Sequence, residues 1–211
     1  MKDSLLQNWL NPVYLTEKKQ QQIREQFANN KPFPHYIFEE FLLPDKALEI
    51  RKTLMTLPFA EKDADLFFFA QTEDLLQTNE SLIRGFLNLL QSEEFQSLLM
   101  NLTGKKLIPA IDAFGAVYPP TGYLLPHDDM LEGRSLAYIY NLSQSFTKSD
   151  GGALELFSTK DHRPQEVVKS YPPKWNSLVI FEVSPDSFHQ VAEVHTDNPR
   201  LSIAGWFHGG R

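Results

Sequence analysis

From about residue 110 to its end, the chain consists of short apolar segments separated by Pro, Gly, Asn and Asp. These segments are rich in β-branched and aromatic residues, as strands are. Short strands at this spacing favour an antiparallel sandwich or barrel, including jelly-roll topologies. We expect strands at residues 112–118, 122–129, 135–143, 152–158, 166–171, 176–183, 187–194 and 200–208.

The first third of the chain has mainly helical patterns. Leu43-Pro44-Asp45 is expected to stop a strand and cap the helix that follows, and Gly104 is expected to end another helix. Periodic apolar positions and the flanking turn residues define the segments. We predict helices over residues 16–29, 45–57 and 81–102, and strands over 34–42 and 65–71.

The organisation favours one domain, because no internal repeat and no linker is visible and 211 residues suit a single core. We predict an α+β, mainly β, fold in which N-terminal helices pack on one sheet. Residues 1–32 are expected to form a helical extension, 33–109 helices and supporting strands, and 110–211 the β core.

Composition narrows the function. The chain has no cysteine, which excludes disulfides, zinc–thiolate sites and thiol nucleophiles. A net charge of -7 and a pI near 5.4 leave no basic footprint for nucleic acid or an anionic membrane. Neither a signal peptide nor a membrane-spanning apolar run of about 18 residues is visible. We therefore expect a cytoplasmic protein without direct nucleic-acid or membrane partners.

The motif Pro126-His127-Asp128-Asp129 is the first candidate for chemistry. Side chains two apart on a strand share a face, so His127 and Asp129 are expected to point into the barrel together. A histidine from a facing strand would complete a 2-His-1-carboxylate set for iron(II), with positions left open for substrates. His189, 62 residues after His127, is the best candidate. A bare His-x-Asp is weak evidence, and His189 alone is equally consistent with a structural histidine.

Arg200 lies eleven residues beyond His189 and is followed two positions later by Ser202. An arginine binds a carboxylate through two parallel hydrogen bonds, and the serine hydroxyl on the same face supports the same group. By itself Arg200 is a routine salt-bridging residue. One strand past a metal-ligand histidine, it becomes the candidate anchor for a dicarboxylate that chelates the iron.

These residues together resemble the signature of the iron(II)- and 2-oxoglutarate-dependent oxygenases with a double-stranded β-helix (jelly-roll, cupin-like) fold. From about residue 33 onward, segments such as FPHYIFEEFL and RLSIAGWFHG resemble the catalytic domain of ribosomal prolyl-3-hydroxylases. Since the chain ends soon after this similarity, it also resembles single-domain bacterial or viral prolyl hydroxylases. The resemblance implies hydroxylation of a prolyl residue, with 2-oxoglutarate decarboxylated to succinate and CO2.

The resemblance also implies the cofactors and further site residues. Fe(II), 2-oxoglutarate and O2 are expected, with ascorbate in support. Tyr118 matches a tyrosine that helps to bind 2-oxoglutarate, and a second family tyrosine falls near Asn141. Either Asn141 replaces that phenol contact or the strand is shifted by one residue, to Tyr140. Trp206 either lines the substrate end of the barrel or belongs to the core.

The substrate stays open at this stage. A ribosomal protein or an elongation factor is the expected protein substrate, and it would need an open groove with mobile loops near residues 58–75 and 143–151. A free amino acid or another small molecule would instead be enclosed. Another class is a non-catalytic cupin-like binding module that has lost its metal, against which the intact set of His127, Asp129, His189 and Arg200 argues. A zinc hydrolase with the same three ligands is the last class, and it leaves Arg200 unexplained.

Overall fold

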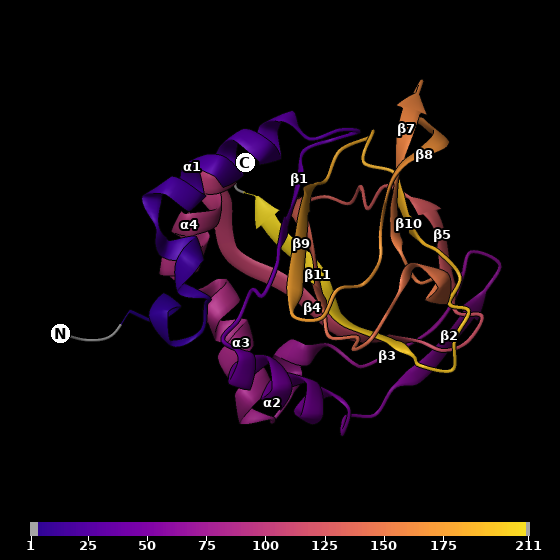
Figure 1. The fold of residues 1–211 in the computed structure, drawn as a ribbon, viewed down its shortest axis with the longest axis horizontal. Coiled ribbons are helices and arrows are strands. Elements are labelled where there is room, and N and C mark those ends of the chain that lie inside the picture. Colours follow the sequence, from indigo (N-terminus) through magenta and orange to yellow (C-terminus); the bar gives the residue numbers. More distant parts are fainter. Residues whose placement is uncertain (1–3, 210–211) are drawn as a thin grey trace.

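In the computed structural model, which describes residues 4–209, an antiparallel sheet curls into a half-barrel (Figure 1). Among these residues eleven strands form one sheet, in the order β1-β9-β6-β11-β4-β3-β5-β10-β7-β8, with β2 paired to β3. This is the expected double-stranded β-helix arrangement. The strands are β1 His35–Phe38, β2 Ala60–Ala64, β3 Phe67–Gln71, β4 Leu107–Tyr118, β5 Tyr123–His127, β6 Arg134–Asn141, β7 Leu154–Lys160, β8 Arg163–Tyr171, β9 Ser177–Glu182, β10 His189–Val191 and β11 Arg200–Gly209.

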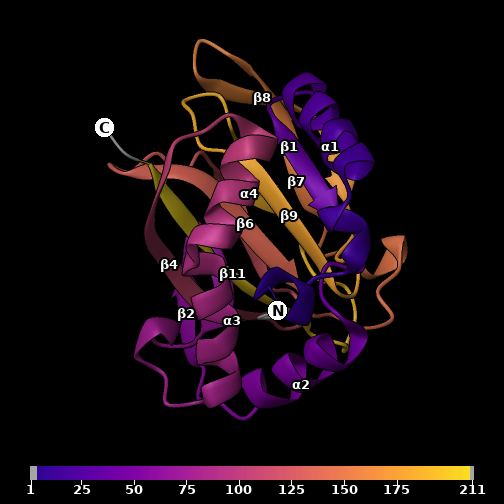
Figure 2. The ribbon, with the colours of Figure 1, turned by 90° about the vertical axis from the view of Figure 1, so that its left-hand side faces the viewer.

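Helices cover one outer face of the barrel, where α3 and α4 cross β6, β9 and β11 (Figure 2). None of the helices in the described part of the chain is long and apolar enough to cross a membrane. The α-helices are α1 Glu17–Asn29, α2 Pro44–Leu54, α3 Ser81–Gln91 and α4 Glu93–Thr103, and the short 3-10 helices are Leu6–Asn8, Pro12–Leu15, Leu75–Gln77 and Lys148–Asp150.

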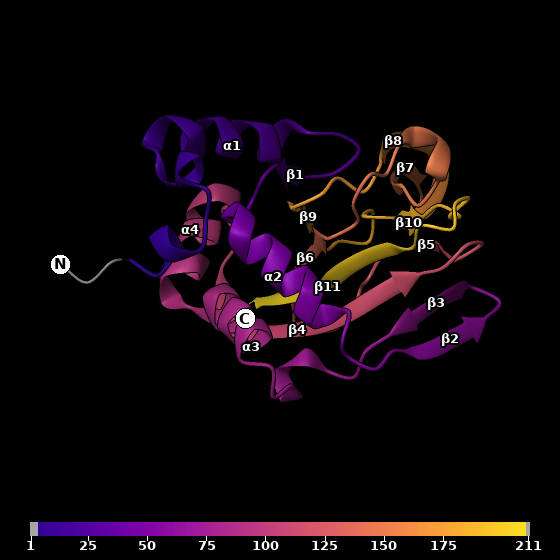
Figure 3. The same ribbon diagram turned by 60° about the horizontal axis from the view of Figure 1, so that its bottom comes forward.

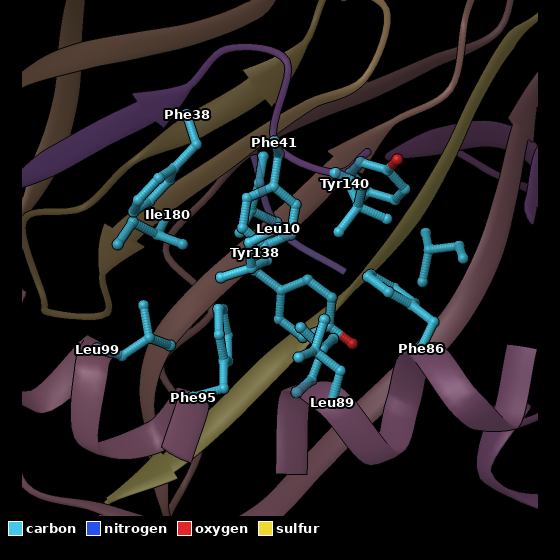
Figure 4. Close-up of a cluster of buried hydrophobic side chains, with 14 of the residues drawn as sticks. Leu10, Phe38, Phe41, Phe86, Leu89, Phe95, Leu99, Tyr138, Tyr140 and Ile180 are labelled. Carbon is cyan, nitrogen blue, oxygen red and sulfur yellow. The ribbon is translucent and has the colours of Figure 1, made fainter. Parts of the chain in front are cut away.

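Strand alternation on β6 separates the main core from the barrel interior. Tyr138 and Tyr140 point to the helices, where they belong to the large aromatic cluster drawn in Figure 4. Ala137 and Ile139 point the other way, into a smaller cluster inside the barrel. One face of the strand therefore packs against the helices, and the other faces the barrel interior, where it can line a site.

The helix predicted over 81–102 is two helices. It breaks at Ser92, whose ψ is 145° and whose hydroxyl accepts a hydrogen bond from the Phe95 amide at 3.2 Å. Ser92 therefore caps α4, and Gly104 ends it in a left-handed conformation as predicted. The cap expected near residue 45 is wrong in detail, because Pro44 is the first helical residue and no side chain caps α2.

Some predicted strands are shorter than expected, and one strand was missed. The strand predicted over 34–42 ends at Phe38, and the one over 122–129 ends at His127. The missed strand, β2, forms a hairpin with β3 beside β4 and β5 (Figure 3). The strand predicted over 65–71 is present as β3, and β2 pairs with it. Much of the segment 58–75, where a peptide substrate was expected to need a mobile loop, is thus a hairpin.

Candidate active site

Three side chains with metal-binding donors, the metal triad of His127, Asp129 and His189, line one cavity. His127 ends β5 and pairs directly with His189, the first residue of β10. The Asp129 carboxylate lies 3.5 Å from His127 Nε2 and 3.3 Å from His189 Nε2. One donor atom from each residue lies within 4.8 Å of the others. Two imidazoles and one carboxylate are a donor set that suits iron(II) with open coordination positions.

Asp129 reaches the triad by a different route from the one expected. The expected shared strand face does not exist, because β5 ends at His127 and Asp129 has a left-handed backbone with φ of 62°. Asp is one of the few residues besides glycine that tolerate this conformation. The Ser187 hydroxyl, just before His189 in the chain, lies 3.1 Å from the Asp128 carbonyl oxygen and 2.8 Å from that of Ser184, so its one proton is shared between this turn and its own segment. A tight turn therefore returns the carboxylate to the site.

Both imidazoles present the same nitrogen to Asp129. His127 Nδ1 lies 2.9 Å from the carbonyl oxygen of Leu125, and His189 Nδ1 lies 2.8 Å from that of Ser187. Since a carbonyl only accepts, each Nδ1 carries the proton and each Nε2 keeps its lone pair. Backbone carbonyls commonly orient metal-binding histidines in this way.

Burial and neighbouring groups set the ionisation of the triad. Burial, with His189 close by, lowers the pKa of His127 to about 4. Burial alone would raise the pKa of Asp129, but the adjacent imidazole of His189, and then that of His127, favour the carboxylate and lower this pKa to about 2. At neutral pH His127 is therefore uncharged and Asp129 is an anion, the forms that bind a metal.

The same cavity holds a buried cation. Arg200 begins β11, pairs with Tyr118 on β4 and is only 2% exposed. Its guanidinium lies 5.0 Å from the centre of the Tyr118 ring, and Nη1 donates to the Ser202 hydroxyl at 3.4 Å. Among the described residues Nε has no hydrogen-bond partner, and no carboxylate forms an ion pair with Arg200. A buried guanidinium short of partners fits an incoming carboxylate.

The cavity is large enough for a small ligand between these groups. Its volume is about 450 Å³, and both the metal triad and Arg200 line it. A dicarboxylic acid bound there can contact the metal site at one end and the guanidinium at the other. The remaining walls are mostly apolar, as in many cofactor sites. They include Phe67, Phe69, Phe114, Ile139, Phe181 and Val191.

Asn141 ends β6 directly opposite Ser202 on β11. It faces the barrel interior but lines a smaller, second cavity that Arg200 also lines. Tyr140 points to the helices, where its hydroxyl donates to the Asn176 side chain at 2.8 Å. The strand is therefore not shifted by one residue, and Asn141 occupies the interior position.

Arg134 is a site residue that strand alternation does not reveal. Counting along β6 places it on the helix side with Tyr138, yet its guanidinium lies 3.3 Å from the centre of the Trp206 ring. Its Nη1 also lies 4.0 Å from an Asp129 carboxylate oxygen. The pairing of β6 with β11 shifts register just after Phe207, which breaks the alternation at this end of the strand. Trp206 accordingly lines the cavity.

Comparison with known sequences agrees with this site. A model of the 2OG-Fe(II) oxygenase superfamily matches residues 114–208, which contain the triad and Arg200. Prolyl 3-hydroxylase OGFOD1 of Xenopus laevis is 46% identical over 181 residues, 84% of this chain and 35% of that protein. Prolyl 3-hydroxylase sudestada1 of Drosophila melanogaster is 36% identical over 220 residues, 97% of this chain and 40% of that protein. The chain thus spans less than half the length of either relative.

Solved structures share the fold at low sequence identity. A prolyl-4-hydroxylase of Pseudomonas putida aligns with a TM-score of 0.72 at 16% identity, over 90% of this chain and 100% of that one. A Trichoplax adhaerens prolyl hydroxylase, in complex with a hypoxia inducible factor oxygen degradation domain peptide fragment, aligns with a TM-score of 0.71 at 17% identity, over 92% and 90%. Over residues 114–208 the chain matches the 2OG-Fe(II) oxygenase superfamily, and the prolyl hydroxylase relatives and the shared fold agree with this match.

Proposed function

We propose that this chain is an iron(II)- and 2-oxoglutarate-dependent dioxygenase that hydroxylates a prolyl residue of a protein, converting 2-oxoglutarate to succinate and CO2. The observation that carries the proposal is the metal triad and Arg200 around one cavity. The triad has the donors that iron(II) needs, and Arg200 has the charge that a dicarboxylate needs. A zinc hydrolase would leave the buried arginine unexplained, and a binding module that has lost its metal would leave the intact metal triad unexplained.

Different side chains would bind the metal and the co-substrate. The two Nε2 atoms and the Asp129 carboxylate would hold iron(II), which supplies O2 activation and the oxidation of a C–H bond when bound. Arg200 would pair with the distal carboxylate of 2-oxoglutarate. The Ser202 hydroxyl accepts from Arg200, so its own proton is free for that carboxylate. Burial raises the pKa of Tyr118 to about 12, which keeps its hydroxyl protonated and able to donate.

The substrate end of the cavity suits a prolyl ring. Trp206 and the Arg134 guanidinium are stacked beside Asp129, and both line the cavity. Such a flat surface next to the metal triad can pack against a pyrrolidine ring. Lys62 and Phe67, from the β2–β3 hairpin, also line the cavity. Because β2 is exposed along its whole length, this wall is accessible to a macromolecular substrate.

A protein of the translation apparatus is the proposed partner, with a ribosomal protein or an elongation factor as candidates. The relatives named as prolyl 3-hydroxylases and the structural neighbour with a bound peptide support a protein substrate. The net charge of -7 suits a basic partner of that kind. A supporting role for ascorbate and a cytoplasmic location belong to the same proposal.

The test is succinate formation by purified, iron(II)-loaded protein, with and without proline-containing peptides from these candidate proteins. Stimulation by one peptide, with the mass of one oxygen atom added to its proline, is the expected result. Turnover that no peptide stimulates would move the search to free amino acids and other small molecules. Iron binding without any turnover would contradict the enzymatic proposal.

Arg200→Ala provides a sharper test of the co-substrate site. We expect the KM for 2-oxoglutarate to rise by about 10- to 100-fold, because a hydrogen bond to a charged group contributes about 1.5–3 kcal/mol. Arg163→Ala, which changes an exposed arginine on β8, is the matched control and should leave this KM unchanged. An unaltered KM in the Arg200 variant would remove Arg200 from the proposed mechanism.

A further inference from the structure

A second cavity, of about 180 Å³, has Arg200 in its wall. Ile139 and Arg200 line both this cavity and the cavity of the metal triad, so these two side chains lie between the two spaces. Asn141 and Ser177 contribute polar atoms to the second cavity, and they are only 4% and 1% exposed. The volume holds several water molecules or the end of a small acid.

Two buried polar atoms at this cavity have no hydrogen-bond partner among the described residues, Arg200 Nε and Asn141 Oδ1. The orientation of the Asn141 amide follows from its neighbour. Ser177 donates its hydroxyl to the Lys174 carbonyl at 2.7 Å and accepts from Asn141 Nδ2 at 3.2 Å. The second hydrogen on that Nδ2 is uncommitted. Buried polar groups without partners are costly, which indicates that the cavity has a polar occupant.

The position of Asn141 links this cavity to the carboxylate site. Asn141 pairs directly with Ser202, so the two side chains emerge next to each other on the interior face. Ser202 in turn accepts a hydrogen bond from Arg200. Asparagine is a short side chain, and a longer one at this position would extend into the second cavity. The space beside Arg200 is therefore open because residue 141 is small.

We propose that the second cavity extends the co-substrate site past Arg200, so that the protein binds 2-oxo dicarboxylic acids one methylene longer than 2-oxoglutarate, such as 2-oxoadipate. Asn141 is then the residue that determines chain length. A longer acid carries its distal carboxylate to the Nε side of Arg200 and to the free Nδ2 hydrogen of Asn141. This inference rests on the proposed function, since it assumes that Arg200 receives the distal carboxylate of a 2-oxo acid.

Equilibrium binding to the full chain loaded with Mn(II), in the absence of O2, tests this without turnover. The quantity measured by calorimetry is the ratio of the Kd for 2-oxoadipate to the Kd for 2-oxoglutarate. We expect a ratio within about 10-fold for the wild type, because the cavity accommodates the methylene group that an enclosed pocket would reject. Asn141→Tyr fills the cavity and should raise the ratio by about 10-fold or more.

Two further variants keep the test interpretable. Asn141→Leu preserves side-chain size but removes the amide, so it should weaken the binding of 2-oxoadipate more than that of 2-oxoglutarate. This variant tests the proposal independently of whether Asn141→Tyr folds. Tyr140→Phe, the neighbouring change on the helix side of β6, should leave the ratio unaltered. Thermal unfolding establishes that each variant is folded.

Each outcome separates the two proposals. A wild type that binds 2-oxoglutarate but discriminates against 2-oxoadipate by more than about 100-fold overturns the extended site and leaves the proposed function standing. An unchanged ratio in both Asn141 variants also overturns it. If neither acid binds the Mn(II)-loaded protein, the proposed function itself fails, and the extension fails with it.

Discussion

At the scale of single residues, Asp129 combines two requirements, a carboxylate and a left-handed backbone with φ of 62°. Asp128, its neighbour, has a different role, because its carboxylate accepts from the Met130 amide at 3.0 Å within the same turn. Two adjacent aspartates thus serve the metal triad and the turn separately. The matched pair of variants at 128 and 129 distinguishes these roles.

Asp129→Ala should abolish succinate formation, because it removes a proposed metal ligand. Loss of a residue that only hydrogen-bonds a ligand weakens metal binding by about 10- to 100-fold, so the loss of iron(II) affinity in this variant should be larger. The measurement is metal titration followed by the succinate assay. Asp128→Ala removes the hydrogen bond that stabilises the turn, but it should retain a measurable fraction of both succinate formation and iron(II) binding. Unchanged turnover in the Asp129 variant would refute the metal assignment.

Gly205 shows a second residue-scale constraint, the close approach of two strands. A Cβ built there would lie 1.9 Å from the backbone oxygen of Asp112 on β4. Gly205→Ala must therefore push β4 and β11 apart, and we expect a loss of at least about 1–3 kcal/mol in the free energy of unfolding, measured with urea. Gly205→Ala with wild-type stability would contradict this packing.

A contrasting glycine provides the control. Gly104 has φ of 72° but no atom within 4 Å of its missing Cβ. Gly104→Ala should therefore cost only about 1 kcal/mol, from backbone conformation alone.

At the scale of elements, Ser92 decides that residues 81–103 form two helices. The buried positions of α3 and α4 face the same sheet, so the apolar pattern runs on through the break and predicts one helix. The signal for the break was present as a serine followed by Glu93 and Glu94, a typical helix start. Periodicity alone could not show it, because both helices bury one face against one core.

Ser92→Ala should lower the free energy of unfolding by about 1 kcal/mol, because the Phe95 amide loses its cap. Urea denaturation measures the change. Ser81→Ala, at the first position of α3, removes a serine that makes no side-chain hydrogen bond in the described structure and should have a smaller effect. Equal stabilities for the two variants would show that the cap contributes nothing.

At the scale of the whole molecule, the two ends of the strand order meet at a seam. β1 and β8 are the terminal strands, and a partly buried hydrogen bond of 2.8 Å joins His35 Nε2 to the Tyr171 hydroxyl. His35 Nδ1 donates to the Phe33 carbonyl at 2.8 Å, so Nε2 is the acceptor. Burial lowers the pKa of His35, which keeps this ring neutral.

Two histidines, His35 at the seam and His127 in the metal triad, predict how the free energy of unfolding depends on pH. His35 and His127 both have pKa values below those of the unfolded chain, near 6.5, and that of His127 is about 4. The unfolded state therefore binds more protons between these values, so the free energy of unfolding is highest above about pH 6.5 and falls as pH decreases toward 4. Urea denaturation of the metal-free protein at several pH values measures the slope.

Tyr171→Phe should lower stability at neutral pH, since the His35 acceptor would lose its donor. A free energy of unfolding that does not change between pH 4 and 6.5 would contradict the neutral state of His35 and His127.

The sequence by itself determined the fold class and identified the three triad residues and Arg200 that line one cavity, because these depend on local strand patterns and on the spacing of motifs. Iron(II) binding by the triad stays a proposal. That residues 1–211 form a single domain stays a prediction. Also predictable was that Tyr140 and Asn141 lie on opposite faces of one strand, which the structure places against the helices and in the interior.

Only the tertiary structure decided how these residues meet. The turn that returns Asp129, the stacking of Arg134 on Trp206 and the second cavity at Asn141 all depend on contacts between β6, β11 and segments distant in sequence. A register shift moves a side chain to the opposite face of the sheet without any change in the local sequence pattern. A cavity is the space that several elements leave between them. Neither property belongs to any single segment, so no local pattern encodes it.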